Sequence, residues 1–173
     1  MDRRSFLKLL GSAVALAEIG PAFAQETPRP LWIRRGKDEF NLDVATIDGY
    51  RAAAWMLRDV QANVSGWPHP HLLLLLSWSQ AWLASHHYYA RYDILSGLRT
   101  KATNDRTEGA SRASTHLPDA NGYFFGVDFR SPNLDAGYTA QMLRAVGMGG
   151  VGLYYQREFV HGDIARPRSW RKP

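Results

Sequence analysis

Apolar residues recur at helical spacing in three segments of the chain. These segments run from about residue 48 to 63, from 69 to 89 and from 135 to 146. Asp48 stands where an N-cap would, and the run Ser65-Gly66-Trp67-Pro68 ends the first segment. The second segment is rich in Leu and Trp and apolar on most sides, which predicts a central buried helix.

Shorter apolar stretches have the character of strands, and most of them lie in the second half of the chain. They are EFNLDV (39–44), YDIL (92–95), YFFGVDFR (123–130), GGVGLYY (149–155) and EFVHGD (158–163). The last two are predicted to form a hairpin, and a polar loop is predicted between residues 98 and 116. Helices therefore precede a small antiparallel sheet, which predicts an α+β fold.

A glycine-rich run joins the third helical segment to the hairpin. Gly147-Met148-Gly149-Gly150-Val151-Gly152 matches G-x-G-x-x-G letter for letter. A dinucleotide site needs this motif after a strand and before a helix, whereas here it follows a helix and enters a strand. We interpret the run as a tight turn that lets backbones approach closely.

The first 24 residues have the features of a cleavable export signal. Paired arginines, Arg3 and Arg4, precede an apolar stretch that ends in Ala22-Phe23-Ala24, the pattern that a signal peptidase cuts after. The twin arginine is typical of export of folded proteins, so we expect cleavage after Ala24 and a periplasmic protein. Residues 25–38 are interpreted as a lead-in and residues 39–173 as a single domain. No apolar run reaches the ~18 residues of a transmembrane span.

Composition limits the chemistry that the chain can perform. The 173 residues are 45% hydrophobic and 21% charged, as in a globular domain. There is no cysteine, so any metal must be held by His, Asp or Glu. The formal net charge is +5, and the basic run at 166–172 could contact nucleic acid. A solvated tail is favoured instead, and the export signal argues against a nucleic-acid partner.

Two histidines stand beside predicted strands with carboxylates nearby. His116 closes the polar loop, Asp128 lies within the 123–130 strand, and His161 lies in EFVHGD. Two imidazoles and one carboxylate make a three-ligand set for Zn²⁺ that leaves a fourth position open to water. Such a site activates water and polarises a carbonyl, and Glu158 or Asp163 could supply a base for amide hydrolysis.

Several short motifs follow one another in the order found in a known family. They are Ser96-Gly97-Leu98-Arg99-Thr100 with Asn104, Ser114-Thr115-His116, Gly126-Val127-Asp128-Phe129, Gly149-Gly150-Val151-Gly152 and Phe159-Val160-His161-Gly162-Asp163. In this order the chain resembles the zinc D-alanyl-D-alanine carboxypeptidase family, which shares the hedgehog fold. The likeness is greatest to its twin-arginine-exported branch of murein endopeptidases, and it spans about residues 40 to 170.

The resemblance implies a metal centre on the sheet, with His116, Asp128 and His161 as the zinc ligands. The family usually has six residues between the first His and the Asp, whereas eleven separate His116 from Asp128 here. Asp119 is therefore a rival ligand, although a side chain that caps its own turn is the commoner role in Pro118-Asp119-Ala120-Asn121-Gly122. Asp128 is favoured because an aromatic residue follows it, as in the family.

The resemblance also implies roles for three residues outside the ligand set. Arg99 matches the arginine that holds a carbonyl or carboxylate oxygen of the substrate, a task that suits a permanently charged guanidinium. Glu158, three residues before His161, is favoured as the catalytic base. Asp163 is expected to orient a ligand histidine, with the base as its alternative role.

These expectations together describe a periplasmic zinc metallopeptidase that hydrolyses peptide crosslinks or stem peptides of peptidoglycan. It would act as an endopeptidase or a carboxypeptidase. The alternative is a zinc-stabilised murein-binding module without catalytic activity, because the lengthened segment between His116 and Asp128 borders the expected active site.

Overall fold

Seven strands form one mixed sheet, which carries the candidate site. The structure is a computed structural model and describes residues 29–173. The strands of this sheet are β1 (Pro30–Arg35), β2 (Asp38–Asp43), β4 (Tyr92–Ser96), β6 (Gly126–Arg130), β7 (Gly150–Tyr154), β8 (Phe159–Asp163) and β9 (Arg168–Lys172). Their order is β2-β1-β4-β6-β8-β7-β9. The α+β class is confirmed, but the sheet is larger than expected.

The sheet is not wholly antiparallel, because both outer parts contain a parallel pair. The pairs β4–β6, β6–β8 and β8–β7 are antiparallel, and β7–β8 is the predicted hairpin. By contrast, β1 runs parallel to β4 and β9 runs parallel to β7. A further two-stranded sheet pairs β3 (Trp67–Pro68) with β5 (Tyr123–Phe124).

Two segments interpreted as irregular form strands of the main sheet. Residues 30–35, which were assigned to the lead-in, are β1, and Leu31 and Ile33 on this strand are fully buried. The basic C-terminal run, interpreted as a solvated tail, contains β9. β1 forms a local hairpin with β2, but its pairing with β4 and the pairing of β9 with β7 join segments that are separated in the sequence. The predicted export signal at 1–24 lies outside the described residues.

Four helices are described, and each begins at a side chain that caps it. They are α2 (Ile47–Met56), α3 (Pro70–Ser85), α4 (Lys101–Arg106) and α5 (Ala136–Val146). The N-cap of α2 is Thr46 rather than Asp48, and its hydroxyl accepts a hydrogen bond from Gly49 N at 3.0 Å. α2 ends at Met56, earlier than predicted, whereas α4 falls within the stretch predicted to be a loop.

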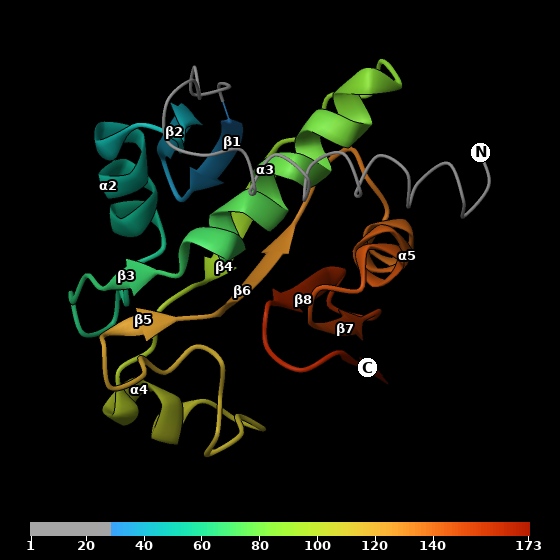
Figure 1. Cartoon of the computed structure of the whole chain (residues 1–173). Helices are drawn as coiled ribbons and strands as arrows, with labels where there is room; N and C mark the ends of the chain where they lie inside the picture. Colours follow the sequence, from blue (N-terminus) through green and yellow to red (C-terminus); the bar gives the residue numbers. More distant parts are fainter. Residues whose placement is uncertain (1–28) are drawn as a thin grey trace.

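The hydrophobic core lies between the sheet and the helices α3 and α5. On β6 and β8 the fully buried side chains of Val127, Phe129 and Val160 point into this core. Leu143 of α5 lies against Gly162 of β8. Figure 1 shows α2 beside β1 and β2 at one end of the sheet and α5 beside β7 and β8 at the other. None of the helices between residues 29 and 173 combines the length and apolar character that a bilayer span needs.

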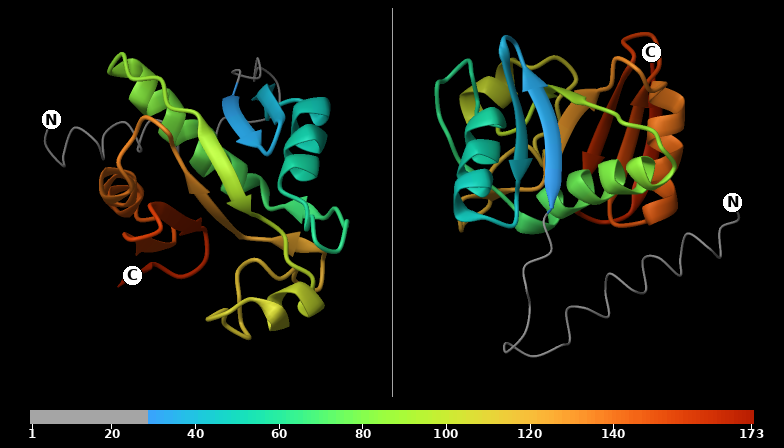
Figure 2. Two further views of the ribbon diagram at one scale, coloured as in Figure 1. Left: turned by 180° about the vertical axis from the view of Figure 1, so that it is seen from behind. Right: turned by 90° about the horizontal axis from the view of Figure 1, so that it is seen from above.

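The loop that follows α4 is held against β6 and the end of β4. Phe125 N donates to Thr115 O at 2.8 Å, and Arg99 N donates to His116 O at 2.9 Å. Phe125 also separates β5 from β6, so the predicted single strand at 123–130 is divided between two sheets. The two views of Figure 2 show α4 and this loop well away from α3. The loop therefore places His116 beside the strands that carry Asp128 and His161.

Candidate metal centre

Three residues predicted as ligands lie together in the structure. Asp128 of β6 and His161 of β8 are directly paired across two antiparallel strands, so their side chains share one face of the sheet. This face is opposite to the core, because side chains alternate along a strand. His116 reaches the same place from the loop after α4. Only 3% of His116, 8% of Asp128 and 6% of His161 is exposed.

The potential ligand atoms of these residues converge on one point. Asp128 Oδ1 lies 2.8 Å from His161 Nδ1 and 3.3 Å from His116 Nε2. The two ring nitrogens are 3.2 Å apart. Within the described residues this is the group of His, Asp and Glu side chains that could hold a metal ion. Its composition fits a His₂Asp zinc site with positions left for water or substrate.

Each histidine is oriented by a hydrogen bond at its other ring nitrogen. His116 Nδ1 lies 2.6 Å from the carbonyl oxygen of Gly97, and His161 Nε2 lies 2.9 Å from Asp163 Oδ2. Protons at these outer nitrogens leave the inward nitrogens, His116 Nε2 and His161 Nδ1, with lone pairs for a metal. Hydrogen bonds of this kind fix the tautomer and the ring orientation of metal-binding histidines.

Asp163 is buried and surrounded by donors. Its Oδ1 accepts from Gly150 N at 2.8 Å and from Ala165 N at 3.0 Å. Arg168 contacts both carboxylate oxygens, with Nη2 to Oδ2 at 2.6 Å and Nη1 to Oδ1 at 3.1 Å. The carboxylate is therefore held in one position, which suits an orienting role toward His161.

The charges of the site are strongly coupled. Burial alone would raise the pKa of Asp163, but hydrogen bonds from His161, Arg168 and Gly150 lower it. Burial would also raise the pKa of Asp128, and the two neighbouring histidines lower it. Burial lowers the pKa of His116 despite the nearby Asp128 carboxylate. Because ligands must be deprotonated to bind a metal, an ionised Asp128 and a neutral His116 are ready to do so.

Arg99 holds the outer oxygen of the ligand carboxylate. Its Nη2 lies 2.5 Å from Asp128 Oδ2, and its Nε donates to Ser96 Oγ at 2.9 Å. These contacts point Asp128 Oδ1 toward the histidines. Arg99 also lines the open side of the site, where a substrate would approach.

A cavity of about 570 Å³ opens directly onto the cluster. His116, Asp128 and His161 form part of its wall, and the loop after α4 forms one side. The opposite side comes from β9 and the turns around β8. A smaller hollow of about 260 Å³ adjoins this cavity, and Arg99 and Asp128 line both.

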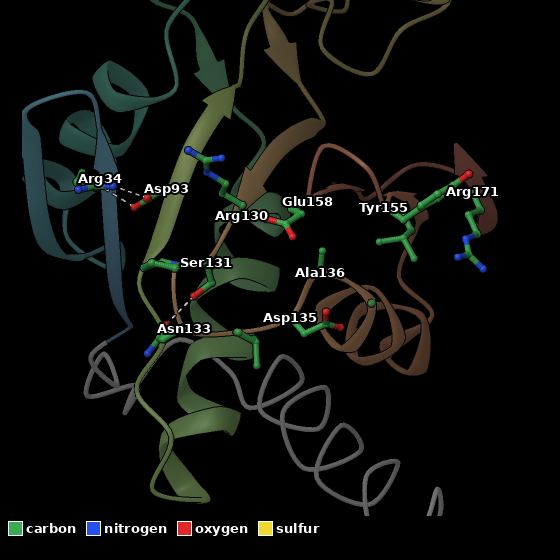
Figure 3. Close-up of a pocket in the computed structure, with 14 residues that line it drawn as sticks. Arg34, Asp93, Arg130, Ser131, Asn133, Asp135, Ala136, Tyr155, Glu158 and Arg171 are labelled. Carbon is green, nitrogen blue, oxygen red and sulfur yellow. Dashed lines mark hydrogen bonds and ion pairs between the residues drawn. The ribbon is translucent and has the colours of Figure 1, made fainter. Parts of the chain in front are cut away.

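The structure does not bring Glu158 to the cluster. Glu158 is exposed in the turn between β7 and β8, with a left-handed φ of 50°. It lines a different cavity, of about 670 Å³, which has no lining residue in common with the site cavity. Figure 3 shows Glu158 in the cavity of about 670 Å³, together with Arg130 and Ala136. The left-handed turn precedes Phe159, whose side chain does line the site cavity, and Glu158 is directed elsewhere.

Asp119, the rival ligand, lies outside the cluster. It is exposed, and its Oδ1 accepts hydrogen bonds from Asn121 N and Tyr123 N, both at 2.9 Å. This is the turn-capping role that its sequence context favours. The residues inserted between His116 and Asp128 thus form a turn and the short strand β5, while Asp128 itself stays in register with His161.

Sequence reasoning missed two residues of β9 that lie close to the site. Arg168 holds Asp163, and the Trp170 ring lies 5.2 Å from that of His161. Both line the cavity together with Lys172. The signal was present in the sequence, because residues 168, 170 and 172 share one face of a strand. The basic composition of the segment is equally typical of a solvated tail.

The glycine-rich run has the structural role inferred from the sequence. Gly147 ends α5 in the left-handed conformation with φ 72°. A Cβ at Gly149 would lie 1.9 Å from the carbonyl oxygen of Asp163, and one at Gly152 would lie 2.4 Å from the Trp170 ring. These glycines let β8 and β9 approach β7, which the metal centre requires.

A buried His–Asp–His set that faces an open cavity on an α+β sheet is an arrangement that metal-dependent hydrolases use. Comparison with known families gives the particular group. A family model described as Peptidase M15 matches residues 50–163, and the chain therefore belongs to the Peptidase M15 family. Membership indicates a zinc-dependent peptidase. No curated protein and no solved structure matches the chain.

Proposed function

We propose that the protein is a zinc metallopeptidase of the periplasm that hydrolyses peptide bonds in peptidoglycan. It would belong to the twin-arginine-exported murein endopeptidase branch of its family. The observation that carries the proposal is the convergence of His116 Nε2, Asp128 Oδ1 and His161 Nδ1 beside an open cavity. The order of sequence motifs that resemble this branch supports the substrate class.

His116, Asp128 and His161 would hold the zinc ion. When bound there, Zn²⁺ would act as a Lewis acid toward the scissile carbonyl and would favour deprotonation of water. Asp163 and Gly97 would keep the two imidazoles in the required tautomers. Arg99 donates one N–H group to Asp128 and one to Ser96, so its remaining N–H groups would bind a substrate oxygen.

The role of base is better met by Glu108 than by Glu158 or Asp163. Glu108 lies on the loop after α4. Among the described residues that line the site cavity, Glu108 and Asp128 are the ones that carry a carboxylate. Asp163 is saturated with hydrogen bonds, and its low pKa makes it a poor proton acceptor. Glu108 would take a proton from the attacking water and deliver it to the departing amine.

Digestion of purified sacculi by the zinc-loaded protein tests this function. We expect soluble muropeptides whose new termini are released by cleavage of amide bonds. Release should stop when a chelator removes the metal and should resume on addition of Zn²⁺. The alternative, a murein-binding module, would retain the protein on sacculi without releasing fragments.

Metal analysis of two matched variants tests the ligand set. The protein should contain one zinc per chain, and His161→Ala should lose it. His71→Ala is the control, because His71 is exposed at the start of α3 and lies outside the cluster. Stoichiometric zinc in His161→Ala would refute the proposed ligands.

Export through the twin-arginine route is proposed from Arg3-Arg4 and Ala22-Phe23-Ala24. Replacing both arginines by lysine should keep the precursor in the cytoplasm. Normal appearance of the mature protein in the periplasm would show that a different route is used.

A further inference from the structure

Positive charge is concentrated in the walls of the site cavity. Five cationic side chains line it, whereas its carboxylates are Glu108 and Asp128. The cationic residues are Arg99, Arg157, Arg166, Arg168 and Lys172. Two of these charges are paired with carboxylates of the protein, since Arg99 pairs with Asp128 and Arg168 pairs with Asp163.

The other three cations have no ion-pair partner among the described residues. We call Arg157, Arg166 and Lys172 the rim cations. Arg157 lies in the β7–β8 turn, with its guanidinium 5.0 Å from the centre of the Phe159 ring. Arg166 is exposed in the connection between β8 and β9, and Lys172 ends β9. All three line the cavity, with Arg157 and Arg166 beside opposite ends of β8 and Lys172 at the end of β9.

The facing side of the cavity offers little negative charge to offset them. It consists of the loop after α4, in which small and hydroxyl-bearing residues predominate and Glu108 is the carboxylate. The loop approaches the rim closely, because Lys172 Nζ lies 4.0 Å from the position that a Cβ would occupy at Gly109. A bound divalent metal would add further positive charge. A ligand that carries negative charge is therefore favoured in this space.

We propose that the rim cations select an acidic peptide, with at least two free carboxylates near the bond that is cut. This inference rests on the proposed function and specifies its substrate. Stem peptides with unamidated side carboxyl groups would be preferred over the same peptides with those carboxyls amidated. Guanidinium groups suit the task because they bind carboxylates through two parallel hydrogen bonds, and Arg157 and Arg166 supply two such groups.

The position of the charges explains why they would act on binding rather than on the reaction. The rim cations belong to the turns and strand end that flank β8, whereas the reacting bond would lie at His116, Asp128 and His161. Contacts made equally in the bound state and the transition state lower KM and leave kcat unchanged. The preference for the free-acid peptide should therefore appear as a lower KM with an unchanged kcat.

A pair of synthetic crosslinked stem peptides, identical except for amidation of the side carboxyls, tests the inference. We expect the zinc-loaded protein to prefer the free-acid peptide by about 10-fold or more in kcat/KM. Each of Arg157→Gln, Arg166→Gln and Lys172→Gln should raise KM for the free-acid peptide about 2- to 5-fold, as for solvent-accessible ion pairs. The triple variant should lose most of the preference, and higher salt should weaken it.

Arg51→Gln is the matched control, since Arg51 is exposed on α2, outside the site cavity. It removes the same charge and should leave both KM values unchanged. Equal cleavage of the two peptides by the wild-type protein would overturn the inference. So would an unchanged preference in the triple variant.

Binding to the zinc-free protein separates this inference from the proposed function. One outcome is that the zinc-loaded protein cleaves neither peptide, while the zinc-free protein binds the free-acid peptide more tightly than the amidated one and the triple variant shows no such difference. In that case the peptidase function fails and the charge selection stands. Absence of binding to both peptides would overturn the charge selection. Binding of inorganic polyphosphate, with no binding of either peptide, would overturn it in favour of a phosphate polymer as the ligand.

Discussion

Asp163 Oδ2 lies 2.9 Å from His161 Nε2, on the side of the ring that faces away from the ligand cluster. The two residues are separated by Gly162 on β8, so their side chains project from the same face of the strand. Arg168 and two backbone N–H groups hold the carboxylate in place. The contact explains how a short strand can present one histidine nitrogen to a metal in a defined tautomer.

Asp163→Asn should weaken zinc binding without abolishing it. The amide is a poorer acceptor for the His161 proton and for Arg168, so the ring is less well oriented and less basic. The usual cost of losing such a partner is about 10- to 100-fold in metal affinity. Competition with a zinc chelator measures it. Asp105→Asn, on the exposed Lys101–Asp105 pair, is the control and should bind zinc as the wild type does.

Asp128→Asn and Asp119→Asn should differ in zinc content. Asp128 supplies an oxygen to the cluster, and a neutral amide is a weak zinc ligand, so the first variant should lose stoichiometric metal. Asp119→Asn should retain one zinc per chain, because Asn can still cap the turn through its side-chain oxygen. Elemental analysis of both purified variants decides between the carboxylates. The reverse result would require the loop at 117–122 to reach the cluster.

Glu158→Gln should digest murein at nearly the wild-type rate, against the expectation from sequence. Its side chain lines the cavity of about 670 Å³, which shares no lining residue with the site cavity. Glu108→Gln makes the same chemical change inside the site cavity and should lower kcat by about 10²- to 10⁴-fold while zinc is retained. Steady-state kinetics with zinc-loaded variants provide the comparison. An inactive Glu158→Gln variant together with an active Glu108→Gln variant would show that Glu158 is the catalytic base.

Asp59→Asn should reduce the stability of the fold near the site. Asp59 is 2% exposed, and its carboxylate accepts from Thr100 N at 2.8 Å and from Gln61 N at 3.1 Å. The amide group would place N–H donors against these N–H groups. We expect a loss of about 1–3 kcal/mol in the free energy of unfolding at pH 7, measured by urea denaturation.

The pH dependence of this loss follows from the pKa of Asp59. Burial would raise that pKa, but hydrogen bonds from Thr100, Thr103 and Ala62 outweigh it and lower the value. A lowered carboxyl pKa contributes stability above the ordinary value, and the contribution is lost as the pH falls through the lowered one. The difference between wild type and Asp59→Asn should therefore shrink in acid. A difference that stays constant down to about pH 2 would exclude the ionised carboxylate as its source.

Sequence alone determined the class of the fold and the candidate ligands. The helical spacing around residues 70–85 and 136–146 and the short apolar stretches around 92–96 and 159–163 are local patterns, and the structure contains those elements. His116, Asp128 and His161 were found because their motifs occur in a recognisable order. Two strands were missed, β1 and β9. β1 forms a tight hairpin with β2, but its proline and its charged surroundings are typical of an irregular segment, and its place beside β4 depends on a distant pairing. β9 has a basic composition and pairs with β7.

Only the tertiary structure decided which of the other charged residues share the site. Glu158 is three residues from His161, yet the left-handed turn before β8 directs its side chain into another cavity. Glu108, Arg166 and Lys172 are distant in the sequence from one another or from the ligands, yet they line one cavity. Local sequence fixes the side of a strand on which a residue lies. The register between strands and the path of the loops decide what it meets there.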